Sequence, residues 1–314
     1  MRLQPLQSCT PSQLAALWDE EERYWSEELF WDYRPTREVL ERYVGARLLP
    51  GFALVEGDEV CGYTYFVADA PVAFVGNLYV RDAAAGPSSY GLLIEACARY
   101  LQSRSDLRRV EMQVFEFNFP FSSVWMGLGF RPVPRRFMVC ELSGENAAPT
   151  PPELPPQWEI VTWRPSLLDA VAHVVYDSYV QSPDAQICWD YRTPTGCRRF
   201  LSNIIANPAC GRFSADETRL LLDPQGNVAA ILLATRINPD TGMIPQISVL
   251  RRYQGRGLGG TLLLDYLRLC RRHGLARVAL SVSEENRRAW GLYERVGFRT
   301  HRPFHALIWD RPGA

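Results

Sequence analysis

The sequence predicts an α/β fold that occurs twice along the chain. Three observations support this prediction: a length of 314 residues, a proline-rich segment near the middle, and two halves with nearly the same order of helices and strands. Because a common single domain has roughly 150 residues, the chain is long enough for two domains that each bury a core.

The proline-rich segment at residues 143–156 reads SGENAAPTPPELPP. Its prolines and small polar residues disfavour both helix and strand. We therefore place the domain boundary here, with a first domain at 1–142, a linker at 143–156 and a second domain at 157–314.

The helices and strands follow the same order in both halves, as meander-like strands and then a strand, helix, strand crossover. In the first half we expect helices at 11–29 and 36–48, strands at 51–56, 60–68 and 72–80, a helix at 89–103, a strand at 108–115, a helix at 119–127 and a strand at 132–141. In the second half we expect a strand at 157–163, helices at 165–180 and 195–206, strands at 218–223, 228–237 and 243–250, a helix at 257–273, a strand at 276–283, a helix at 287–296 and a strand at 300–309.

Direct alignment of the halves supports an internal repeat. LYVRDAAAGPSSYGLL (78–93) aligns without gaps with ISVLRRYQGRGLGGTL (247–262), and NFPFSSVWMGLGF (118–130) aligns with NRRAWGLYERVGF (286–298). The alignment pairs Gly86 with Gly255, Asn118 with Asn286, and Trp125 with Tyr293. Agreement at so many special positions indicates a duplicated unit.

Composition limits the class of protein. With 47% hydrophobic and 22% charged residues, the chain resembles soluble globular proteins. No apolar run reaches the roughly 18 to 20 residues of a membrane span, and the start MRLQPLQSCTPSQ lacks a secretion signal, so we expect a cytoplasmic protein without membrane partners. The eight cysteines form no CxxC pair and no metal-ligand spacing with the four histidines, so we expect reduced thiols and no metal site.

Charge differs between the halves. Residues 1–150 hold 14 arginines against 20 acidic residues, a balance of −6, and residues 151–314 hold 20 against 15, a balance of +5. A positive field on the second half would suit a polyanionic ligand, although arginines on a solvated helix face would give the same balance. The pI of 6.5 and the lack of a basic stripe argue against nucleic-acid binding.

A glycine-rich turn, QGRGLGG at 254–260, lies between an apolar strand and an amphipathic helix. Glycines let successive backbone N–H groups converge, and the helix start adds partial positive charge, so the turn can bind a phosphate group. The spacing alone also fits a tight loop before any helix, or a dinucleotide fingerprint. The second alternative fails on context, because that fingerprint follows the first strand of its domain.

Two motifs together identify a resemblance. QGRGLGG resembles the QxxGxG/A pyrophosphate motif of the GNAT superfamily of acyl-CoA-dependent N-acyltransferases, and NRRAWGLYERVGF resembles its NxxAxxLYxxxGF segment. The resemblance covers 157–309 and implies a central mixed, twisted sheet flanked by helices, whose fourth and fifth strands splay to admit the pantetheine arm of acetyl-CoA. It implies that acetyl-CoA is bound by Ile247, Ser248, Val249, Gln254, Gly255, Arg256, Gly257, Leu258, Gly259, Gly260 and Asn286. The duplicated plan also resembles mycothiol synthase, although no acceptor follows from architecture.

The resemblance places Tyr293 near the sulfur of the thioester. An attacking amine has to be neutral and the departing thiolate needs a proton or a hydrogen bond, which a phenol with a pKa near 10 can supply. Helical spacing with Leu292 and Val296 is equally typical of a core residue, and Asn286 could be a helix N-cap as well as a ligand contact. We assign no general base.

The first copy lacks these features. Pro87 removes one N–H donor from the aligned turn, and Tyr90 adds bulk where Gly259 lies in the second copy. Trp125 replaces Tyr293, and an indole N–H is no practical proton donor to a thiolate. We therefore expect a degenerate, structural or substrate-shaping first domain.

These observations predict an acetyltransferase that uses acetyl-CoA and a primary amine of a small molecule or a protein N-terminus. Acceptor residues are expected in the poorly matched part, the helices within 165–206 and the loop at 181–196 between them. In that loop Asp184, Gln186, Trp189 and Tyr191 could receive an amine, or could equally form a surface loop packed by its own aromatic residues. An alternative function is a non-catalytic acyl-CoA sensor or interaction module.

Overall fold

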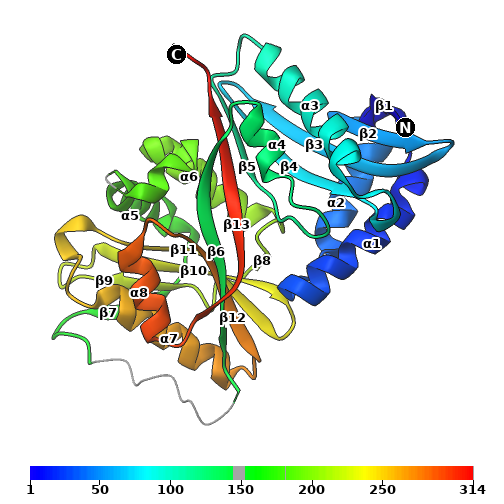
Figure 1. Ribbon diagram of the computed structural model, residues 1–314. Helices are drawn as coiled ribbons and strands as arrows, with labels where there is room; N and C mark the ends of the chain where they lie inside the picture. Colours follow the sequence, from blue (N-terminus) through cyan, green and yellow to red (C-terminus); the bar gives the residue numbers. More distant parts are fainter. Residues whose placement is uncertain (144–152, 181, 314) are drawn as a thin grey trace. The chain divides into compact units, whose positions relative to one another are not determined.

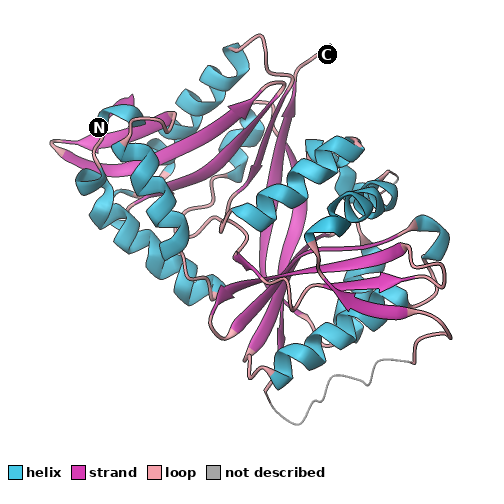
Figure 2. Cartoon of the chain, turned by 180° about the vertical axis from the view of Figure 1, so that it is seen from behind, coloured by secondary structure: helices cyan, strands magenta, loops and turns pink. Residues whose placement is uncertain are grey.

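The computed structural model describes residues 1–143, 153–180 and 182–313 of the chain. These residues form two compact units. The first unit comprises residues 1–134 and 304–314, and the second comprises residues 135–303. Figures 1 and 2 show that each unit combines β-strands with packed α-helices, as the sequence predicts.

The first unit is a mixed sheet in the order β1-β2-β3-β4-β5-β13. Strands β2, β3 and β4 form an antiparallel meander, and β5 then joins β4 in parallel. Its elements are β1 (Arg2–Pro5), α1 (Pro11–Leu29), α2 (Arg34–Gly45), β2 (Gly51–Glu56), β3 (Glu59–Asp69), β4 (Val72–Val80), α3 (Pro87–Ser103), β5 (Arg109–Gln113), α4 (Ser122–Gly127) and the end of β13 (Arg299–Asp310).

Helices cover both faces of this sheet. One core cluster joins α1 and α2 to the sheet around Trp18, Leu40 and Tyr63. The other joins α3 and α4 to the opposite face around Leu93 and Trp125. Because successive strand residues point to opposite faces, the alternating apolar residues of the meander supply both clusters.

The second unit repeats this plan with the sheet order β6-β12-β11-β10-β9-β7. Strands β10 and β11 are antiparallel, and β12 joins β11 in parallel. Its elements are β6 (Arg131–Glu141), β7 (Glu159–Thr162), α5 (Leu168–Tyr179), α6 (Pro194–Ala206), β8 (Arg212–Phe213), β9 (Arg219–Leu222), β10 (Val228–Asn238), β11 (Thr241–Val249), α7 (Leu258–Arg272), β12 (Arg277–Ser283), α8 (Arg287–Arg295) and the start of β13.

Two layers of helix cover this second sheet. Helices α7 and α8 share a core cluster with the sheet, which includes Leu232, Leu262, Leu280 and Phe298. Helix α5 packs against β10 and β11, and α6 packs against α5. The loop between α5 and α6 contains two short 3-10 helices, η4 (Pro183–Gln186) and η5 (Trp189–Arg192), which the sequence did not predict.

The last strand of each sequence copy belongs to the other unit. Residues Arg135–Glu141 of β6 pair antiparallel with Ser283–Arg277 of β12, and Ala306–Asp310 of β13 pair with Gln113–Arg109 of β5. The spatial units therefore differ from the linear division at 1–142, 143–156 and 157–314, because each copy completes its sheet with the other copy's final strand. Residues 144–152 of the predicted linker lie outside the described residues.

All eight cysteines are free thiols, and seven of them are buried. Burial raises the pKa of Cys97 and of Cys270 to about 12, so these thiols remain protonated at neutral pH. No described helix combines the length and apolar character that a membrane-spanning helix requires.

Candidate active site

Strand β11 has an open edge beside the glycine-rich turn. Its parallel pairing with β12 runs from Thr241, opposite Arg277, to Ile244, opposite Leu280. From Gln246 onward β11 pairs with β10 on its other side, and no described strand pairs with its β12-facing edge at 246–249. Except for the Val249 carbonyl, which accepts a hydrogen bond from Gln254 Nε2, the backbone N–H and C=O groups along that edge can bond an extended ligand that carries amides.

The three strand residues predicted to bind acetyl-CoA lie on this open edge. Ile247 and Val249 are half-buried against the core that contains α7. Ser248 points to the other face, where its hydroxyl oxygen accepts a hydrogen bond from Gln246 Nε2 at 2.7 Å and meets Ser178 Oγ at 2.9 Å. Side-chain contacts therefore fix both faces of the strand while its edge remains open.

Two glycines give the glycine-rich turn its backbone conformation. Gly255 and Gly257 have φ angles of 83° and 80°, in the left-handed region that residues with a Cβ rarely adopt. Gly257 is the N-cap of α7 and offers no side chain to the first helical turn. The backbone N–H groups there can therefore bind an anion, supported by the helix dipole.

Side chains hold this turn against the strand end. Gln254 Nε2 donates a hydrogen bond to the Val249 carbonyl oxygen at 3.0 Å, and Arg288 donates to Gln254 Oε1 at 3.1 Å. The Arg256 guanidinium lies 5.4 Å from the centre of the Tyr253 ring. Arg256 and Arg288 thus both lie at the glycine-rich turn.

The first turn of α7 is closely packed behind the glycines. Leu258 is buried in the core. A Cβ on Gly259 would lie 3.4 Å from the Val249 side chain, and a Cβ on Gly260 would lie 3.4 Å from Leu292. Both are ordinary van der Waals distances, so the first turn of α7 packs against the strand and α8 without requiring glycine for space.

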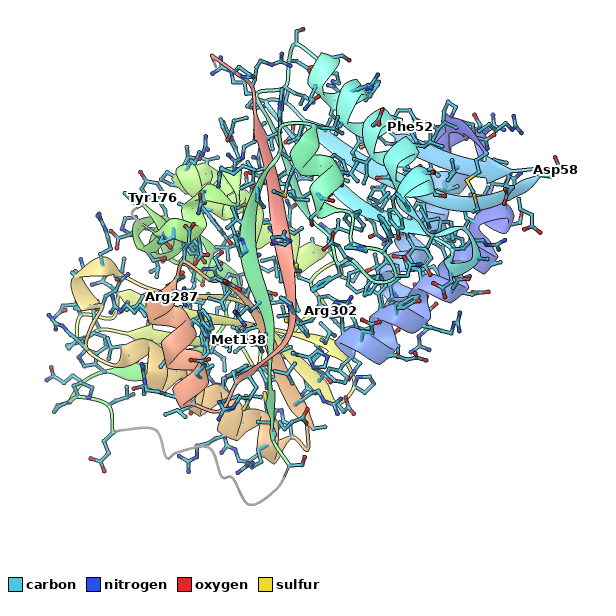
Figure 3. All side chains as sticks on the ribbon, viewed as in Figure 1. Phe52, Asp58, Met138, Tyr176, Arg287 and Arg302 are labelled. Atoms are coloured by element: carbon cyan, nitrogen blue, oxygen red, sulfur yellow. The ribbon has the colours of Figure 1, made fainter. Side chains whose placement is uncertain are left out.

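Asn286 immediately precedes α8, whose first residue, Arg287, is labelled in Figure 3. Its Oδ1 accepts a hydrogen bond from the backbone N–H of Ala289 at 3.2 Å, so Asn286 is the helix N-cap. Its Nδ2 donates to Asp184 Oδ2 at 2.5 Å. One side chain thus caps α8 and holds Asp184 of the α5–α6 loop.

Tyr293 is buried in the core of the second unit, with 6% of its surface exposed. Burial raises the pKa of its phenol well above the ordinary value, and the charges of Tyr179 and Asp184 raise it further, while Arg135 opposes them. The phenol is therefore protonated at neutral pH, which suits a hydrogen-bond or proton donor.

A buried polar cluster lies between β11 and the α5–α6 segment. Gln246 Nε2 donates to the Tyr179 hydroxyl at 3.1 Å, and the Tyr191 hydroxyl donates to Gln246 Oε1 at 3.3 Å. The two tyrosine ring centres are 4.0 Å apart. Tyr191 was one of the acceptor residues considered from sequence, whereas Tyr179 was missed because its position at the end of an apolar helix gives no polar signal.

Arg135 was also missed. It is opposite Ser283 in the β6–β12 pairing, and its charge partly offsets the rise that burial causes in the pKa of Tyr179, Tyr191 and Tyr293. It lies in the strand that ends the first sequence copy, so only the exchange of strands brings it to this site. No local sequence signal could have indicated this.

In the first unit, side chains occupy the corresponding position. The β4–β5 pairing likewise ends early, at Val75 opposite Met112. Here the Tyr90 hydroxyl donates to Asn118 Oδ1 at 2.6 Å and accepts from the backbone N–H of Val80, and Asn118 Nδ2 donates to the Val80 carbonyl at 2.8 Å. Side chains thus bond both backbone groups of Val80 in the first unit, whereas at the aligned Val249 the carbonyl accepts a side-chain hydrogen bond from Gln254.

The Acetyltransferase (GNAT) family profile matches residues 184–298, which include the open edge, the glycine-rich turn and Tyr293. The chain contains a GNAT acetyltransferase domain. A mycothiol acetyltransferase from Parafrankia sp. (strain EAN1pec) is 45% identical over 60 residues, which is 19% of this chain and 19% of that relative. The match therefore spans about a fifth of the relative's length.

Solved structures support the fold over a much longer part of this GNAT-containing chain. A GCN5-related N-acetyltransferase from Sphaerobacter thermophilus has a TM-score of 0.71 at 19% identity, and the match covers 100% of this chain and 96% of that one. A tandem GNAT protein from the clavulanic acid biosynthesis pathway has a TM-score of 0.57 at 16% identity, with 85% and 84% covered. At such identities the likeness establishes the fold, including its tandem form.

Proposed function

We propose that the second unit transfers an acetyl group from acetyl-CoA to a primary amine. The observation that carries this proposal is the open edge of β11 at 246–249, which runs into the glycine-rich turn and shares a core with Tyr293. An acyl-CoA has a matching order of groups: a diphosphate, an arm with amide groups, and a thioester.

The groups of acetyl-CoA match the residues along and beside the open edge of β11. Gly255 and Gly257 shape a turn whose N–H groups can receive the diphosphate, and Ile247–Val249 offer backbone groups to the pantetheine amides. Asn286 lies at the start of α8, on the segment that leads to Tyr293. The protonated Tyr293 phenol stabilises the negative charge that develops on sulfur as the C–S bond breaks.

We assign this activity to the second unit alone. In the first unit Tyr90 and Asn118 bond to the corresponding strand edge, Pro87 begins α3, and Trp125 is fully buried at the position of Tyr293. These side chains leave neither the free edge nor the phenol that the proposed chemistry requires.

A thermal-shift experiment tests the cofactor part. Acetyl-CoA at about 100 times its Kd should stabilise the wild type by about 2.7 kcal/mol. The variants Gly257→Trp and Gly259→Tyr should lose most of this shift, the second because it copies Tyr90 of the first unit. Gly91→Tyr, the same substitution in α3, is the matched control and should keep it. Equal shifts in all four proteins would contradict the proposed site.

A second experiment tests catalysis. Release of free CoA is measured with a panel of primary amines, and Tyr293→Phe should lower kcat by about 10²-fold while it keeps the acetyl-CoA thermal shift. An acetyl-CoA-dependent shift with no turnover on any amine would instead favour the sensor function.

A further inference from the structure

Asp184 has one carboxylate oxygen without a hydrogen-bond partner although the residue is buried. Only 7% of its surface is exposed, and Oδ2 is held by Asn286 at 2.5 Å. Oδ1 is inaccessible and makes no hydrogen bond within the part of the chain that the structure describes. An unsatisfied buried carboxylate oxygen is costly, so such an atom calls for a partner that the protein itself does not supply.

The residues around the Asp184 carboxylate are those of the proposed acetyl transfer. Asp184 lies in η4, which packs against α5 and η5, the elements that carry Tyr179 and Tyr191. Burial raises the pKa of these two phenols and of Tyr293, and the charge of Asp184 adds to that rise. Asn286, the N-cap of the helix that carries Tyr293, holds Asp184 through Oδ2. The carboxylate is therefore on the α5–α6 side of β11, where Tyr179 and Tyr191 bond to Gln246 at the start of the open edge.

The missing partner is more consistent with an ammonium group than with a metal ion. Among the residues described, no group of three or more histidine, cysteine, aspartate or glutamate side chains is arranged to hold a metal. The short helix η4 that contains Asp184 instead packs against α5 and η5, which carry the Tyr179–Tyr191 ring pair, and aromatic rings stabilise organic cations as well as their apolar substituents.

We propose that Asp184 binds the protonated amine of the acceptor through Oδ1 and removes one proton from it. This proposal rests on the acetyltransferase function above and names the residue that selects its acceptor. Asp184 is thereby a catalytic residue, and the acceptor class is a primary ammonium whose carbon substituent contacts Tyr179 and Tyr191.

The proton balance is complete with groups already present. Asp184 takes a proton from R–NH₃⁺, which leaves a neutral amine whose lone pair attacks the thioester carbonyl carbon. The C–N bond forms and the C–S bond then breaks, with its electron pair leaving on sulfur. Tyr293 gives its proton to that sulfur and takes one from the nitrogen, so the products are the N-acetylated amine, free CoA thiol and the proton on Asp184, which passes to solvent.

A binding experiment separates charge recognition from catalysis. Benzylammonium and benzyl alcohol, which have nearly the same shape, are titrated calorimetrically into the full chain saturated with CoA. The wild type should bind benzylammonium at least about tenfold more tightly, since hydrogen bonds to charged groups are the stronger ones. Asp184→Asn, which keeps an oxygen for Asn286, should lose that preference.

Asp190→Asn is the matched control. Asp190 is also a buried acidic residue of the α5–α6 loop, but both of its carboxylate oxygens accept hydrogen bonds from Arg199. Its substitution should lower the melting temperature and leave the preference for benzylammonium unchanged. Equal or absent binding of both probes by the wild type, or a preference retained by Asp184→Asn, overturns the proposal.

Turnover gives a second readout. At neutral pH aliphatic amines are protonated and arylamines are not, so only the former need a proton acceptor. Asp184→Asn should lower kcat/KM for benzylamine about 10²-fold and for aniline much less. The acetyl-CoA thermal shift is measured on the same samples: its absence in the wild type refutes the acetyltransferase function, whereas a normal shift with equal losses on both amines refutes only the role of Asp184.

Discussion

Asn286 Nδ2 donates a hydrogen bond to Asp184 Oδ2 at 2.5 Å, while Asn286 Oδ1 accepts one from the Ala289 backbone at 3.2 Å. The start of α8 and the α5–α6 loop are therefore joined by a single side chain. Because α8 also carries Tyr293, this residue sets the distance between the proposed proton donor and the proposed amine-binding group.

Two substitutions at Asn286 should separate its roles. Asn286→Ser keeps an oxygen that can cap α8 but cannot reach Asp184, whereas Asn286→Ala loses both contacts. We expect both variants to lower kcat/KM by about tenfold or more through the loss of a charge-assisted hydrogen bond. Only the alanine variant should lose a further 1 kcal/mol or so of stability from the missing cap. If thermal unfolding shows the two variants to be equally stable, the proposed capping role of Asn286 is wrong.

Local sequence signals predicted most elements closely. Helix α1 runs over Pro11–Leu29 as expected, because proline suits a first helical turn and Gln13 Oε1 accepts from the Thr10 backbone at 2.9 Å as in a capping box. Strands β2 and β4 also begin and end as predicted. The ends of these elements are set by neighbouring residues in the sequence, which is why a local sequence pattern could predict them.

The exchange of β6 and β13 could not be predicted in this way. Both strands are equivalent copies with similar patterns, so local preference is the same whichever sheet edge they join. Their choice depends on contacts between residues far apart in sequence. The burial of Asp184 was not predicted because its local sequence pointed to exposure: the surrounding serine and proline residues are typical of an exposed turn.

The contrast between the two units predicts a binding stoichiometry. Tyr90 and Asn118 bond to the strand edge of the first unit, so we expect one molecule of acetyl-CoA per chain. Isothermal titration calorimetry should give a single site, and Gly259→Tyr should abolish it rather than halve the number of sites. A remaining site in that variant would show that the first unit also binds the coenzyme.

Glu217 should make the second unit sensitive to acid. Burial by itself raises the pKa of its carboxyl, but hydrogen bonds from Arg236 and His273 outweigh burial and lower the pKa to about 2. Because this value lies below the unfolded pKa of 4.5, the ionised carboxylate stabilises the fold above pH 4.5 and loses that effect as pH falls toward 2.

The variant Glu217→Gln should therefore melt below the wild type at pH 7, and the two melting curves should converge as pH decreases from about 4.5 to 2. Asp169→Asn serves as the control, since Asp169 is 81% exposed in its ion pair with Arg198 and should contribute little at any pH. A constant difference between Glu217→Gln and the wild type across that range would contradict the proposed electrostatic origin.

The exchange of final strands predicts that the two sequence copies will not fold as separate fragments. A fragment of residues 143–314 lacks the β6 residues that pair with β12, and a fragment of residues 1–142 lacks the β13 residues that pair with β5. Each fragment would expose the edge of a central sheet, which favours aggregation. We expect both to be insoluble when expressed separately and to be soluble and to purify together when expressed in the same cell. Two soluble, separately folded fragments would instead mean that each copy can complete its sheet with its own last strand.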